Sequence, residues 1–146
     1  MASDDYTERL KRIPLFDAME PQALRSLLFA GETRLLRAGE TLFRRGDSSD
    51  CGFVLTSGSI AFESDAGGPA DKIVRSPALL GETALVAATE RAITAIAGEP
   101  ATLLKISREL FHQILDQHPL TATQVREYFR NRLEELGKEL KFDMSP

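Results

Sequence analysis

The middle of the chain, from Thr33 to Ser107, consists of short runs rich in strand-forming residues, most of them separated by glycine. Many short strands at near-regular spacing are typical of a β-sandwich or a β-barrel. The sequence therefore predicts a β-rich core built from strands at residues 33–37, 40–44, 51–56, 58–64, 72–75, 91–97 and 101–106.

Helical patterns flank this β-rich middle. Residues 6–12 favour a helical turn or two. A longer helix is expected to begin at Glu20-Pro21 and to continue through Phe29, because proline suits a first helical turn and the leucines that follow share one face. Ser107 is predicted to cap a helix that continues through Leu115, and a final helix is predicted from Pro119 to about Leu140.

One stretch of the middle places two charged side chains in a run that is otherwise apolar or small. It reads Leu-Leu-Gly-Glu-Thr-Ala-Leu over residues 79–85, and Glu90-Arg91-Ala92 follow. Ionised side chains are rarely buried unless something pairs with them. Glu82 can accept a hydrogen bond from a sugar hydroxyl, and Arg91 can make a bidentate contact with a phosphate. These residues alone leave two interpretations open: a sugar-phosphate site, or a Glu82–Arg91 salt bridge that holds a loop.

The wider pattern resembles the cyclic-nucleotide-binding domain family. Gly81, Glu82, Ala84, Leu85, Arg91 and Ala92 fall on the template of that family's phosphate-binding cassette. Signposts upstream also match the family's spacing, so that the resemblance covers about residues 10–136: Pro14-Leu15-Phe16, Gly39-Glu40, Gly46-Asp47 and Gly58.

The resemblance implies an α+β, mainly β fold: an eight-stranded, double-sheet, jelly-roll-like β-roll with a short cassette helix. The chain is then a single domain over residues 1–146, with N-terminal helices at 6–30, the roll with its cassette at 31–106 and two C-terminal helices at 107–141.

The same resemblance implies a non-catalytic sensor for a 3′,5′-cyclic mononucleotide. Arg91 is expected to bind the exocyclic phosphate with help from the backbone N–H groups of Thr83 and Ala84. Glu82 is expected to accept the ribose 2′-hydroxyl, and Gly81 to allow a close approach of the ligand. A threonine after the cassette arginine helps to select guanine in the family, so Ala92 favours cAMP over cGMP. Binding is expected to reach an effector protein through the C-terminal helix.

Departures from the family pattern leave alternatives open, among them a region before the cassette, Arg75-Ser76-Pro77, that is shorter than usual. Leu80 replaces an aromatic residue before Gly-Glu, and Glu90 replaces a common proline before Arg91. An added carboxylate beside a phosphate site weakens affinity through like-charge repulsion. One alternative is therefore a degenerate roll that binds no nucleotide, pairs Glu82 with Arg91 and serves as a protein–protein interaction module. Another is the excised sensor domain of a channel or a kinase subunit.

The final helix carries one apolar stripe, formed by Ala122, Val125, Phe129, Leu133, Leu136 and Leu140. We expect this stripe to cover the roll and to act as a mobile lid, and we favour that role over a weak homodimer through the same helix. Two heptads are few for a stable coiled coil. Tyr128, Phe129 and Arg132 are the candidates to stack on the base, Arg132 by a cation–π or guanidinium contact.

Composition excludes several other functions. A formal net charge of −4 argues against broad nucleic-acid binding, which needs a basic face. No run is long and apolar enough to span a bilayer, and the acidic first residues do not form a signal peptide. Cys51 is the only cysteine and is expected to be a buried thiol, which favours the cytoplasm. No metal or catalytic motif is present, so we expect no enzyme activity and no cofactor beyond the ligand itself.

Overall fold

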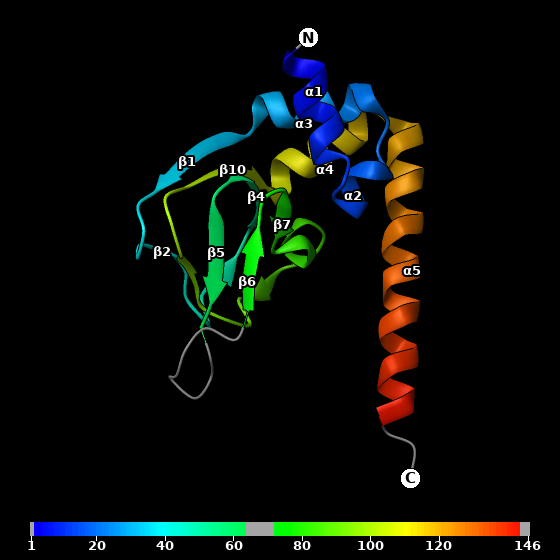
Figure 1. Cartoon of the computed structure of the whole chain (residues 1–146). Helices are drawn as coiled ribbons and strands as arrows, with labels where there is room; N and C mark the ends of the chain where they lie inside the picture. The colour runs from blue at the N-terminus through cyan, green and yellow to red at the C-terminus, as the bar shows by residue number, and fades with distance from the viewer. Residues whose placement is uncertain (1, 64–71, 144–146) are drawn as a thin grey trace.

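Two antiparallel four-stranded sheets form the β-rich middle of the chain (Figure 1). The computed structural model describes residues 2–63 and 72–143. In the first sheet the strand order is β1 (Glu32–Leu36), β10 (Ala101–Ser107), β4 (Cys51–Ser57) and β7 (Ala78–Leu80). In the second sheet it is β2 (Thr41–Phe43), β9 (Ala95–Ala97), β5 (Ser59–Phe62) and β6 (Lys72–Arg75). These eight strands of the described residues confirm the predicted double-sheet roll.

The central strands of the first sheet are apolar on both faces because the sheet lies between two cores. In β4, Phe53 and Leu55 point into the roll, whereas Val54 points toward the helices. In β10, Leu103 belongs to the roll and Leu104 to the helical side. Successive side chains of a strand face opposite ways, so each strand supplies both cores. We call these the roll core (Cys51, Phe53, Leu55, Ile60, Leu80, Ala95, Ala97, Ala101 and Leu103) and the helical core.

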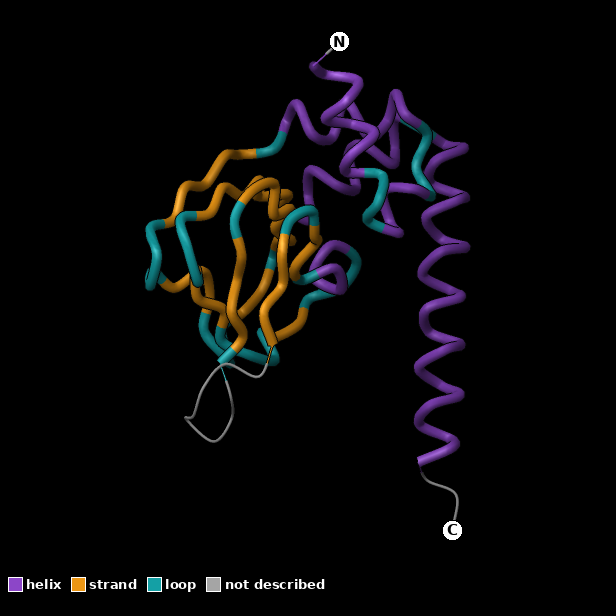
Figure 2. The backbone as a smooth tube through the Cα atoms, in the orientation of Figure 1, coloured by secondary structure: helices purple, strands orange, loops and turns teal. Residues whose placement is uncertain are grey.

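Helices gather at one end of the roll, where they enclose the helical core (Figure 2). Three precede the sheets: α1 (Ala2–Leu10), α2 (Pro14–Asp17) and α3 (Pro21–Ala30). Two follow them: α4 (Arg108–Gln117) and α5 (Pro119–Asp143). The Ser107 side chain accepts a hydrogen bond from the Leu110 N–H at 3.0 Å, which confirms the predicted N-cap of α4. The four helices predicted at the two ends of the chain are confirmed within a few residues of their predicted positions, whereas α2 was not expected from the sequence.

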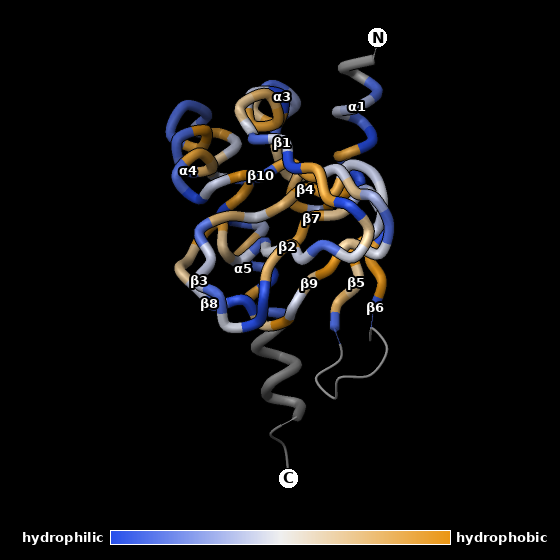
Figure 3. The backbone as a smooth tube through the Cα atoms, turned by 90° about the vertical axis from the view of Figure 1, so that its left-hand side faces the viewer, coloured by the Kyte–Doolittle hydropathy of each residue, from blue (hydrophilic) through white to orange (hydrophobic). Residues whose placement is uncertain are grey.

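Three short strands were not expected from the sequence. One is β7, an apolar run of three residues. The other two, β3 (Ser48–Ser49) and β8 (Thr89–Glu90), form a separate small sheet. Hydrophilic positions gather around β3 and β8, whereas hydrophobic positions run through α3 and β4 (Figure 3). The predicted strand at 91–97 is wrong in its first half, and the end of the strand predicted at 58–64 lies outside the described residues.

Only the first half of α5 packs as the apolar stripe predicted. Val125 is buried, and Phe129 is half-buried against the helical core. Leu133 is 69% exposed, and α5 leaves the helical end and runs alongside the roll (Figure 1). The side chains of Leu136 and Leu140 lie outside the described residues. The first half of the stripe therefore covers the helical core, while Leu133 faces solvent.

Candidate functional site

The cassette folds as a tight turn directly after β7. Gly81 has a left-handed backbone conformation, with φ 76° and ψ 38°, and precedes a 3₁₀ helix, η1 (Glu82–Leu85). The predicted helical turn is present and is short. Ala84 and Leu85 are buried, and Leu85 belongs to the helical core. The packing of Leu85 fixes η1 against the helices, so that the cassette joins the roll to the helical end.

Arg91 lies immediately after β8 and turns into the roll. Its N–H donates to the Asp47 carbonyl at 2.8 Å, and its carbonyl accepts from the Gly46 N–H at 2.8 Å. These bonds to a turn replace the strand pairing that the sequence predicted for this residue. The side chain is buried, with Arg91 only 8% exposed. Its Nη2 donates to the Cys51 carbonyl at 2.7 Å and lies 3.4 Å from the Cys51 Sγ.

Glu82 contacts α5 and not Arg91. The Tyr128 hydroxyl donates to Glu82 Oε2 at 3.0 Å, and Arg132 Nε lies 3.6 Å from Glu82 Oε1. Burial and the neighbouring Glu82 charge raise the pKa of Tyr128 to about 12. The Glu82–Arg91 salt bridge of the alternative interpretation is therefore absent from the ion pairs of the described residues: the two side chains have different partners.

The structure brings two of the three candidate base-stacking residues to the cassette. Tyr128 and Arg132 both contact Glu82. Phe129 packs against the helical core and meets Tyr128 edge-on, with ring centroids 5.2 Å apart. Ala92, which follows the buried Arg91 in the chain, is exposed. Tyr128 and Arg132 thus connect the cassette to the C-terminal helix.

The backbone N–H groups of Thr83 and Ala84, which were expected to assist Arg91, differ in their hydrogen-bond partners. The Ala84 N–H donates to the Gly81 carbonyl at 3.1 Å, which closes the first turn of η1. Among the described residues, the Thr83 N–H has no such backbone bond, and Thr83 is exposed. The first N–H groups of a helix lack partners within the helix. The Thr83 N–H can therefore act as the donor to a phosphate that the resemblance implied.

Sequence reasoning missed Arg108, the first residue of α4. Its Nε donates to the Ala84 carbonyl at 2.8 Å, and its Nη2 donates to the carbonyls of Ser49 at 2.6 Å and Ala87 at 3.2 Å. Its N–H also donates to the Asp50 carbonyl at 2.7 Å. One guanidinium thereby connects α4, β3 and the far end of the cassette turn. An arginine at a helix start opposes the helix dipole, and this was the available signal.

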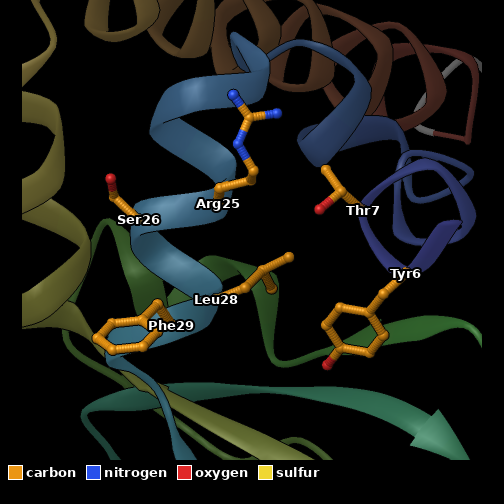
Figure 4. Close-up of a pocket in the computed structure, with 6 residues that line it drawn as sticks. All are labelled: Tyr6, Thr7, Arg25, Ser26, Leu28 and Phe29. Atoms are coloured by element: carbon orange, nitrogen blue, oxygen red, sulfur yellow. The ribbon is translucent and has the colours of Figure 1, made fainter. Parts of the chain in front are cut away.

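Pockets formed by the described residues lie at the helical end, between its helices. One of about 470 Å³ lies between α1 and α3, where Tyr6, Leu28 and Phe29 form an apolar surface below Arg25 (Figure 4). Another of about 560 Å³ lies between α2 and α5 and includes Asp17, Glu127 and Tyr128. Within the described part of the chain, no helix has the length and apolar character needed to cross a membrane.

Comparison with known proteins gives independent evidence of the family to which the chain is similar. A family model described as "Cyclic nucleotide-binding domain" matches residues 33–118. The Cyclic AMP receptor protein of Thermus thermophilus is 29% identical over 134 residues, which cover 90% of this chain and 62% of that protein. The cAMP-dependent protein kinase regulatory subunit of Yarrowia lipolytica is 29% identical over 106 residues, which cover 69% of this chain and 26% of that protein.

A solved structure of a cyclic nucleotide-binding-like protein from Brucella abortus is 38% identical, with a TM-score of 0.69. The match covers 77% of this chain and 98% of that one. The chain spans less than two thirds of the length of both curated relatives, whose names describe a receptor and a regulatory subunit.

Proposed function

The chain belongs to the cyclic nucleotide-binding domain family, and we propose that it is a non-catalytic sensor for a 3′,5′-cyclic mononucleotide, cAMP in preference to cGMP. The names of the two curated relatives, both of which refer to cyclic AMP, support cAMP as the ligand. Ala92, which has no hydroxyl to offer a guanine, supports the same preference. The single buried cysteine favours a reducing compartment, and we place the protein in the cytoplasm.

The observation that carries this proposal is the state of the Arg91 guanidinium. It is buried, and its hydrogen-bond partners among the described residues are neutral: a backbone carbonyl and a thiol. A buried cation without an anionic partner is unfavourable, and a bound monoanion would relieve that cost. The cyclic phosphodiester is such a monoanion, and arginine offers it paired N–H donors. The exposed Thr83 N–H supplies a further donor on the cassette turn.

The contacts of Glu82 support transmission through α5. In the proposed complex the Glu82 carboxylate accepts the ribose 2′-hydroxyl, and it is now held by Tyr128 and Arg132. The nucleotide therefore changes the environment of a group that α5 already contacts. A ligand shifts a conformational equilibrium only if it binds the two states with different affinities. Glu82 supplies that difference, because its carboxylate is shared between the nucleotide and α5. An effector protein would then read the position of α5, whose Leu133 is exposed.

The test is the melting temperature of the chain with and without nucleotide. A ligand at a hundredfold its Kd stabilises the folded state by about 2.7 kcal/mol, which for a chain of this size is a rise of roughly 5–10 °C. We expect this rise with cAMP, a smaller one with cGMP and none in Arg91→Ala. Arg44→Ala removes an equal charge from an exposed position nearby and should keep the rise. A folded wild-type chain that responds to neither nucleotide would refute the proposal.

A further inference from the structure

The guanidinium of Arg91 lies against two aromatic rings. Its Cζ is 4.4 Å from the centroid of the Phe43 ring and 5.7 Å from that of Phe53. Phe43 is in β2 and Phe53 is in β4, so the two rings come from different sheets of the roll. The rings are themselves 6.2 Å apart and tilted by 32°. Together they form an aromatic cradle (Phe43 and Phe53) for one cation.

The cradle occupies the place that a carboxylate usually takes beside a buried arginine. The ion pairs of the described residues join Arg34 to Glu32, Arg130 to Glu127 and Arg132 to Glu82, and none includes Arg91. The faces of aromatic rings carry negative potential and attract a guanidinium, most strongly where water is excluded. Arg91 is buried in that way. The rings therefore hold the cation without neutralising its formal charge.

The geometry separates the two kinds of contact that an arginine makes. The face of a ring attracts the cation, and a guanidinium can stack on it with its flat face, whereas hydrogen bonds leave from the edge of the guanidinium. One edge nitrogen of Arg91 is used by Cys51, and a planar guanidinium has five N–H donors in all. Contact with a ring thus leaves other N–H donors for an anion. A carboxylate partner, by contrast, would compete for the same edge.

We propose that Phe43 is a positioning residue that holds the Arg91 guanidinium through its face and thereby sets the affinity of the site for the nucleotide phosphate. The inference rests on the proposed function. Phe43 is the closer ring and is only half-buried, so its replacement disturbs the roll core less than replacement of the buried Phe53.

The test replaces Phe43 while keeping the fold. Phe43→Leu removes the ring and should weaken cAMP binding about tenfold, whereas Phe43→Trp keeps a cation-binding face and should bind within about threefold of wild type. Stepwise fluorination of the Phe43 ring reduces its negative face with little change of shape, and should weaken cAMP binding in steps. Phe62→Leu is the matched control, because Phe62 also packs against the roll core from the second sheet and should leave binding unchanged.

Equal affinity in Phe43→Leu, Phe43→Trp and the fluorinated proteins would overturn the proposal, as would an equal loss in Phe62→Leu. The melting temperature of the nucleotide-free fluorinated series keeps this test separate from the proposed function. If wild type binds neither cAMP nor cGMP, the proposed function fails. A stepwise fall in melting temperature would then still support the face contact, and a constant melting temperature would refute it.

Discussion

The guanidinium of Arg91 occupies the space that a side chain at residue 81 would need. A Cβ placed on Gly81 would overlap Arg91 Nη1, and Gly81 also has a positive φ of 76°. The sequence pattern assigned Gly81 to a close approach of the ligand. The structure gives this glycine a second role, because it makes room for the residue proposed to bind the phosphate.

Gly81→Ala should therefore lose both stability and binding. The left-handed conformation alone costs a residue with a Cβ about 1–2 kcal/mol. Displacement of Arg91 adds to this cost, so the unfolding free energy should fall by more than about 2 kcal/mol, and the response of the melting temperature to cAMP should disappear.

Gly39→Ala is the matched control for this variant. Gly39 has a φ of 89°, and a Cβ there would meet nothing within 4 Å. In Gly39→Ala the unfolding free energy should fall only by the cost of the left-handed backbone conformation, and the melting temperature should still respond to cAMP. Equal stability losses in the two variants, with cAMP binding retained in both, would show that Arg91 tolerates a side chain at residue 81.

Arg91→Met should separate stability from binding. Methionine fills much of the same volume against the aromatic cradle and removes a buried cation that has no anionic partner among the described residues, which is unfavourable where it stands. We expect an unfolding free energy in denaturant at least equal to that of wild type, together with loss of cAMP binding. A fall of about 2 kcal/mol or more would instead mean that Arg91 is kept for the fold.

Tyr128→Phe should bind cAMP more tightly than wild type, by about twofold to tenfold. The substitution removes the hydroxyl that donates to Glu82 and keeps an aromatic ring for the base. Isothermal titration calorimetry would measure the change. Tyr128→Ala removes the ring as well, so weaker binding in that variant beside tighter binding in Tyr128→Phe would assign both roles to Tyr128. Weaker binding in Tyr128→Phe would contradict the competition for Glu82.

Arg108→Ala should loosen the cassette from α4. Three backbone carbonyls lose their partner: those of Ala84 and Ser49 are part-buried, and buried acceptors left without donors cost about 1–3 kcal/mol, whereas the exposed Ala87 carbonyl can turn to water. Hydrogen exchange should rise at residues 84–87, and cAMP binding should weaken because the cassette is less well ordered. Arg25→Ala, an exposed change in α3, is the control. Unchanged exchange at the cassette in Arg108→Ala would contradict this role.

The parts of the fold that the sequence predicted are those with local causes. The Ser107 cap, the proline starts of α3 and α5 and the apolar pattern of β4 can each be read within a few residues. By contrast, β3 and β8 are two residues long, and each is a strand only because the other lies beside it, with Ser48 opposite Glu90. Pairing across that distance cannot be read from either segment alone.

In the candidate site, too, the sequence predicted the features with local causes and not the contacts between distant segments. The cassette motif located Gly81, Glu82 and Arg91, because their residue types and spacing are local. The partners of these residues come from strands and helices far along the chain: Cys51 for Arg91, and Tyr128 for Glu82. Arg108 was missed because its role depends on three carbonyls that only the folded chain brings to it. Its own neighbours in the sequence indicate no more than a helix start.

The raised pKa of Tyr128 predicts a loss of stability at high pH. The ordinary pKa of the phenol is 10.0, and burial together with the Glu82 charge raises it to about 12 in the folded chain. Between these values the unfolded chain releases the proton while the folded chain keeps it, so the folded state binds more protons and its stability falls as pH rises. The contribution of Tyr128 to the free energy of unfolding is fully present below about pH 10 and is lost by about pH 12.

Denaturant unfolding at pH 9 and pH 11 would measure this loss, because pH 9 lies below the ordinary pKa of 10.0 and pH 11 lies between 10.0 and about 12. Tyr128→Phe should show a smaller difference than wild type between the two pH values. The chain has two tyrosines and no tryptophan, so the ultraviolet absorbance of phenolate reports on these two groups alone, and the single Tyr→Phe variants assign each titration. Burial also raises the pKa of Tyr6, which makes Tyr6→Phe the necessary control: it should retain the late titration of Tyr128. If Tyr128 titrates with the unfolded chain's pKa while the protein is folded, its hydroxyl does not donate to Glu82 in solution, and the link between the cassette and α5 depends on Arg132 alone.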